Sequence, residues 1–160
     1  MLYAVPKRWF AWDFWLLEPT GALAAEVLVS SWRERGALVV GGSEYRIHRQ
    51  GLLGAFILEG PDGSQAAVAE KPSAFRREFL VRRGEHHYVL KAVSVFGRKY
   101  GLYHDHTQIG TIAPASWFGR RAMVDLGDDL PPALQGFIVW LTLILWKRAS
   151  DSSGSDGAGS

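Results

Sequence analysis

The sequence predicts a mainly β protein: a twelve-stranded closed antiparallel barrel, built from three four-stranded repeats, around a central hydrophobic C-terminal helix. Three observations lead to this prediction. The sequence repeats itself with a period of about 42 residues. Within a repeat, short apolar stretches alternate with turn-forming residues. A long apolar run follows the last repeat. The 160 residues, 48% of them hydrophobic, suit one domain over residues 1–150.

Each repeat opens with a tyrosine, and Tyr3, Tyr45 and Tyr88 lie 42 and 43 residues apart. A glycine then sits in a turn-like stretch between apolar runs. These glycines are Gly21, Gly63 and Gly110. Further on, each repeat carries a Ser, an aromatic residue and an Arg, in the ranges 31–33, 73–76 and 116–120.

One strand is expected at each opening Tyr, one on either side of the glycine turn, and one after the Ser-aromatic-Arg segment. Four strands in each of three repeats make twelve. A propeller blade also has four strands, but propellers have about four to eight blades. A closed or nearly closed barrel is therefore the better prediction.

A helix is expected at about 133–147. Prolines stand where its first turn needs no N–H donor, acidic residues precede it, and Lys147 and Arg148 follow the apolar run. The helix is apolar on every face, so protein or lipid must enclose it. Its 14 residues from Ala133 to Trp146 span only ~21 Å, whereas a membrane span needs about 20 apolar residues. A twelve-stranded barrel leaves a lumen that this helix would fill.

Two alternatives for the helix remain open: a C-terminal membrane anchor and a helix buried in a dimer. Residues 151–160 are almost wholly Ser, Gly and Asp and are expected to form a disordered tail.

The composition narrows the function. The net charge of +2 is too small to indicate nucleic acid. The sequence has no Cys and its N-terminus does not read as a signal peptide, which favours the cytoplasm. Sequence motifs of hydrolases, nucleotide-binding loops and zinc proteases are absent, so neither catalysis nor a cofactor is expected. His104 and His106 would share one face of a strand, but they fall at a predicted turn, which favours solvent exposure over a metal site.

Paired arginines recur at matched positions and are the candidate binding residues. Planar guanidinium groups bind phosphate through two hydrogen bonds. If these arginines gather at one end of the barrel beside Trp32, Trp117 or Phe118, an anionic membrane surface becomes a plausible partner. Alternatively, they pair with carboxylates and keep strand edges soluble. The candidates are Arg33, Arg76, Arg77, Arg120 and Arg121.

In the order of its repeats, its Ser-aromatic-Arg corners and its closing apolar helix with Phe137 and Trp140, the chain resembles the tubby C-terminal superfamily. Among its branches, the chain is most similar to the LURP-one-related and phospholipid scramblase-like proteins. The resemblance implies a twelve-stranded barrel around a hydrophobic helix, in a superfamily whose members bind phosphoinositides or other anionic membranes. The chain lacks the Cys-rich and Pro-rich segments of the scramblases, so the resemblance does not extend to lipid transport.

Scramblase-like proteins also carry an acidic stretch before the helix that is proposed to bind calcium. The matching residues are Asp125, Asp128 and Asp129, although their spacing is not that of a twelve-residue calcium loop. Helix capping explains them without a metal. The sequence thus predicts a monomeric, non-enzymatic module for anionic phospholipid, peripheral at the inner face of a membrane. The alternative is a structural or protein-interaction domain.

Overall fold

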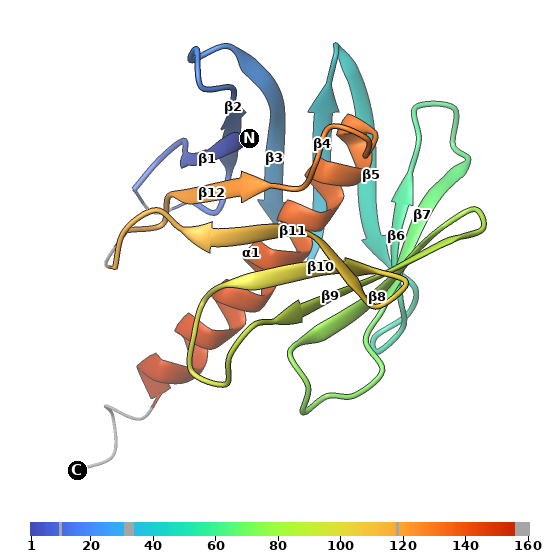
Figure 1. Cartoon of the computed structure of the whole chain (residues 1–160). Helices are drawn as coiled ribbons and strands as arrows, with labels where there is room; N and C mark the ends of the chain where they lie inside the picture. The colour runs from blue at the N-terminus through green and yellow to red at the C-terminus, as the bar shows by residue number, and fades with distance from the viewer. Residues whose placement is uncertain (10, 31–33, 118, 156–160) are drawn as a thin grey trace.

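The computed structural model describes residues 1–9, 11–30, 34–117 and 119–155. The strands are β1 (Leu2–Pro6), β2 (Phe14–Leu17), β3 (Leu23–Ser30), β4 (Arg35–Val40), β5 (Ser43–Arg49), β6 (Phe56–Glu59), β7 (Gln65–Glu70), β8 (Glu78–Arg83), β9 (His86–Ala92), β10 (Tyr100–His104), β11 (Thr107–Pro114) and β12 (Ala122–Asp125), followed by helix α1 (Pro132–Ser155). The strands are antiparallel and follow one another around a closed barrel, which the pairing of β1 with β12 completes (Figure 1). This confirms the predicted fold class.

The opening tyrosines mark the first strand of each repeat, since Tyr3 lies in β1, Tyr45 in β5 and Tyr88 in β9. The glycine alignment is wrong in the third repeat. There the turn is at Asp105 and His106, both with positive φ, and Gly110 lies within β11. Gly110 is needed there for another reason: a Cβ would lie 2.7 Å from the Asp125 carbonyl oxygen.

Alternate residues of the strands point into the barrel and are buried, which is the period-two pattern of a sheet with one covered face. In β2, for example, Phe14 and Leu16 are buried whereas Trp15 is exposed. The inward side chains from all twelve strands form one hydrophobic core with α1. The helix therefore occupies the space that the strands alone could not fill.

Every residue of α1 from Phe137 to Trp146 is buried. Two indole groups fix its position, because Trp140 Nε1 donates to the Leu28 carbonyl at 3.2 Å and Trp146 Nε1 donates to the Arg98 carbonyl at 3.0 Å. The buried Thr142 hydroxyl donates to the Ile138 carbonyl at 3.0 Å. Among the described residues, no buried side-chain nitrogen or oxygen lacks a partner.

The helix begins at Pro132, as its sequence indicates, but its predicted end near 147 is wrong. It continues to Ser155, so residues 151–155 are helical rather than part of a disordered tail, and 156–160 lie outside the described residues. Lys147 pairs with Asp151 one turn later at 2.7 Å, and the Ser153 hydroxyl donates to the Ala149 carbonyl. These local contacts extend the helix past its last apolar residue.

The two ends of the barrel differ in their connections. Connections after odd-numbered strands meet at one end, here called the loop end, and include 7–13, 50–55, 71–77, 93–99 and 115–121. Connections after even-numbered strands are short turns at the opposite end, the turn end, and comprise 18–22, 41–42, 60–64, 84–85, 105–106 and 126–131. The helix enters at the turn end and leaves at the loop end (Figure 1).

Candidate functional site

The loop end is positively charged and the turn end is negatively charged. The loop-end connections and the end of α1 hold Lys7, Arg8, Lys71, Arg76, Arg77, Arg98, Lys99, Arg120, Arg121, Lys147 and Arg148. Three carboxylates, Asp13, Glu34 and Asp151, lie in the same segments. Two strand carboxylates also pair with these cations, Glu26 with Lys7 and Glu78 with Arg76. The described turn-end connections have no Lys or Arg but hold Glu18, Asp62, Glu85, Asp105, Asp128 and Asp129. The small net charge of the chain therefore hides a strong separation of charge.

The loop end also carries the most exposed apolar side chains of the described chain. Seven of them are between 79% and 99% exposed: Trp9, Leu52, Leu53, Phe75, Val95, Phe96 and Trp117. They come from five different connections. The next most exposed large apolar residues, Met1 and Leu23, reach only 55%. We call these seven side chains the apolar tips.

Two of the tip-bearing loops are each stabilised by the same kind of internal hydrogen bond. The backbone N–H of Gly97 donates to the Ser94 hydroxyl at 3.0 Å, and that of Gly119 donates to the Ser116 hydroxyl at 3.1 Å. Each bond closes a short turn whose apex holds apolar residues, Val95 and Phe96 in the first loop. Such side-chain to backbone bonds are the usual means of ordering a turn.

Two of the predicted binding arginines hold neighbouring loops in place. The Arg77 guanidinium donates to the carbonyls of Ser94 at 2.8 Å and Gly97 at 3.1 Å. The Arg120 guanidinium donates to the carbonyls of Ala11 at 2.7 Å and Arg8 at 2.8 Å, and also to that of Trp9. Their donors are used within the fold, while their positive charges remain at the loop end.

The side chains of two other predicted arginines are exposed at the surface. Arg76 is 75% exposed and lies 3.6 Å from the Glu78 carboxylate. Arg121 is exposed and lines a groove of about 800 Å³ together with Arg8 and Arg120. The fifth predicted residue, Arg33, lies outside the described residues, as do Trp32 and Phe118.

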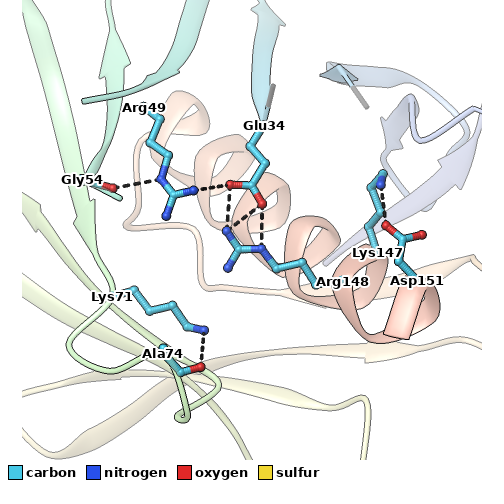
Figure 2. A network of polar contacts seen from close by, with 8 residues as sticks. All are labelled: Glu34, Arg49, Gly54, Lys71, Ala74, Lys147, Arg148 and Asp151. Carbon is cyan, nitrogen blue, oxygen red and sulfur yellow. Dashed lines mark hydrogen bonds and ion pairs between the residues drawn. The ribbon is translucent and has the colours of Figure 1, made fainter. Parts of the chain in front are cut away.

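A cluster of charges, absent from the sequence prediction, surrounds the exit of the helix (Figure 2). The Glu34 carboxylate accepts from Arg49 at 2.7 Å and from Arg148 at 2.7 and 2.8 Å. Lys71 lies in the same cluster and donates to the Ala74 carbonyl at 3.2 Å. Burial and the charge of Arg148 lower the pKa of Lys71, although Glu34 opposes this. Glu34 thus pairs with two arginines, and the nearby Lys71 adds a third positive charge to the cluster.

A second groove, of about 640 Å³, lies between the connections 93–99 and 115–121 and is lined by Phe96, Arg98, Lys99 and Trp117. Arg98 forms the link between these connections, because its guanidinium donates to the Gly119 carbonyl at 3.2 Å. The same guanidinium lies over the Trp146 ring, 4.6 Å from its centre. Burial lowers the pKa of Arg98.

The calcium candidates Asp125, Asp128 and Asp129 are exposed at the turn end, on the far side of the barrel from the arginines. The first turn of α1 holds no acidic residue, and among the described residues none of these aspartates forms a hydrogen bond with the helix. The rings of His86 and His104 are 5.9 Å apart at the same end. No group of three or more His, Asp or Glu residues in the described ranges is arranged to hold a metal ion.

No helix in the described part of the chain has the length and hydropathy to cross a membrane. Comparisons with protein-family models, with curated proteins and with solved structures return no match to this chain. The loop end, with its charge and its apolar tips, is therefore the feature from which a function can be inferred.

Proposed function

We propose that this chain is a tubby-like, non-enzymatic binding module that attaches to anionic phospholipid surfaces through its loop end. The observation that carries the proposal is the separation of charge along the barrel. The loop-end connections and the end of α1 hold eleven Lys and Arg residues and three carboxylates, whereas the described turn-end connections hold six carboxylates and no Lys or Arg. A molecule with this polarity turns its positive end toward a negative surface.

The length of the barrel makes this polarity effective. The eight residues of β3 extend about 26 Å at about 3.3 Å per residue, or roughly 20 Å along the axis of a barrel with tilted strands. At physiological salt, charges are screened within about 8 Å. The turn-end carboxylates therefore lie too far from a surface at the loop end to weaken its attraction.

The predicted arginines would act in two ways. Arg76 and Arg121 offer exposed guanidinium groups to lipid phosphates. Arg77 and Arg120 contribute charge but bind backbone carbonyls. Among the described residues, no carboxylate lies within ion-pair distance of either of these two. Each cation near an anionic surface contributes about 1 kcal/mol.

The test is flotation of the purified protein with phosphatidylcholine vesicles, with and without phosphatidylserine, at low and high salt. Binding is expected only with phosphatidylserine and should weaken as salt rises. The double variant Arg76→Ala, Arg121→Ala should bind about 30-fold more weakly at low salt, from two contributions of about 1 kcal/mol.

The matched control is Arg46→Ala, Arg83→Ala, which removes the same charge from exposed strand positions outside the loop end, in the middle of β5 and at the turn end of β8. Its binding should change much less. Equal losses for the two double variants would contradict docking through the loop end. A protein that ignores both kinds of vesicle would favour the alternative of a structural or protein-interaction domain.

A further inference from the structure

We propose that the seven apolar tips enter the membrane interface, so that the barrel docks end-on with the exit of its helix facing the bilayer. This inference rests on the proposed function and adds to it a mode of binding and an orientation. It starts from the exposure of the tips, because single exposed apolar residues are ordinary on protein surfaces whereas a gathered set marks a contact site.

The tips are spread around the mouth of the barrel. The strands follow one another in order around the barrel, so connections at one end follow one another around its circumference. The tips lie on the β1–β2, β5–β6, β7–β8, β9–β10 and β11–β12 connections. A partner that meets all five must be broad and must face the end of the barrel. A bilayer is such a partner.

The chemistry of the loop end fits a membrane interface. Four of the seven tips are Trp or Phe, residues that interfacial segments bury at the boundary between headgroups and acyl chains. Cations stand beside them in sequence, as in Arg8-Trp9, Phe75-Arg76 and Phe96-Gly97-Arg98. Apolar residues next to Lys and Arg are typical of segments that lie in an anionic interface.

Two other partners fit less well. A second copy docked end to end would bring eleven cations against eleven others, and like charges across an interface oppose association. A nucleic acid would meet its phosphates with cations, but Leu52 and Leu53 stand in a connection that has no Lys or Arg. Contact with phosphates would leave these two aliphatic side chains in water, whereas the acyl region of a bilayer would bury them.

The tips are held ready for insertion. Arg77 fixes the β9–β10 connection, Arg98 ties it to the β11–β12 connection, and Arg120 fixes the β1–β2 connection. Ordered loops lose little conformational entropy on binding. These three guanidinium groups contact the backbone of the tip-bearing loops, so insertion of the tips brings them to the level of the lipid phosphates.

The chain has no Cys, so a single introduced cysteine can be labelled specifically at any chosen position. We would substitute Leu53→Cys, Phe75→Cys or Phe96→Cys, attach an environment-sensitive fluorophore, and add vesicles of phosphatidylcholine and phosphatidylserine with a quencher on the acyl chains. All three probes should shift to shorter wavelength and be quenched. The matched control is Leu23→Cys, an exposed apolar position beside the turn end, whose probe should not respond.

A second measurement uses unlabelled protein. The variant Leu53→Ser, Phe96→Ser keeps every charge, and each lost tip should weaken vesicle binding about tenfold. Binding that survives at high salt should fall most, since it depends on apolar contact. Circular dichroism should show an unchanged fold, because both side chains are almost fully exposed.

The outcomes separate the two proposals. No binding to anionic vesicles would overturn the proposed function. Binding with silent tip probes would leave that function standing and overturn insertion, as would equal quenching at Leu23. Probes that become buried without vesicles as protein concentration rises would show a second copy at the loop end and overturn the bilayer as its occupant.

Discussion

The substitution Gly36→Ala tests how tightly the helix fits the barrel. Gly36 lies in β4, and a Cβ at this position would stand 2.1 Å from Trp140 Nε1 and 2.4 Å from the Leu28 carbonyl oxygen. These are the two atoms that form the hydrogen bond between α1 and β3. A single methyl group would thus fall on the contact that fixes the middle of the helix.

The cost follows from this geometry. Forcing an extra methyl group into a packed interior costs about 1–3 kcal/mol. Trp140 is fully buried, so loss of its bond leaves an indole N–H without a partner, at a further cost of about 1–3 kcal/mol. We expect Gly36→Ala to lower the free energy of unfolding by about 2–6 kcal/mol, a large part of the 5–15 kcal/mol that is typical of a domain.

Urea unfolding followed by circular dichroism measures this free energy. The control Gly154→Ala makes the same change in α1 where no atom lies within 4 Å, and should be neutral or stabilising by up to about 1 kcal/mol. Adding Trp140→Phe to Gly36→Ala removes one of the clashing atoms, so the double variant should be less destabilised than the sum of the singles. Wild-type stability in Gly36→Ala would refute the fit inferred here.

Two further predictions concern charge. Burial raises the pKa of Tyr100 above its ordinary value of 10.0. The contribution of the neutral phenol to stability is therefore fully present below pH 10 and is lost as the pH rises through the raised pKa. In urea unfolding, Tyr100→Phe should lose less stability than the wild type above pH 10, and an equal loss of stability would show that another group is responsible. Glu34→Gln should cost about 1–2 kcal/mol through its two half-buried arginine partners, and should lower the Lys71 pKa further, as NMR titration would show. Asp151→Asn, at an exposed pair, should cost less than about 0.5 kcal/mol in the same assay.

The fold could be predicted because its signals are local and repeated. Tyr3, Tyr45 and Tyr88 mark equivalent strands, and an apolar run too long for a strand indicates the buried helix. The end of the helix could not be placed the same way, since the Lys147–Asp151 pair and a serine hydroxyl extend it beyond Trp146, its last large apolar residue. Gly110 misled the alignment because close packing against Asp125, rather than a turn, requires a glycine there.

The roles of the arginines depend on contacts that sequence spacing does not reveal. Arg120 reaches a carbonyl 109 residues away, and Arg77 reaches one 17 residues away. In the pair Arg76-Arg77 the second arginine holds a loop, whereas in the pair Arg120-Arg121 the first one does. The sequence of the pairs does not indicate this difference. The gathering of charge did have a signal: in an antiparallel barrel every second connection shares an end, and counting charges along alternate connections separates the cations from the carboxylates.

The helix that passes through the barrel also sets the order in which the protein can be completed. All twelve strands precede α1 in the chain, so they leave the ribosome before the element that fills their interior. Until α1 arrives, inward side chains such as Phe14 and Phe56 have no helix to cover them, and exposed apolar faces of this kind promote aggregation. Closure through β1 and β12, which are the first and the twelfth strand, must wait for α1 to be made or must reopen to admit it.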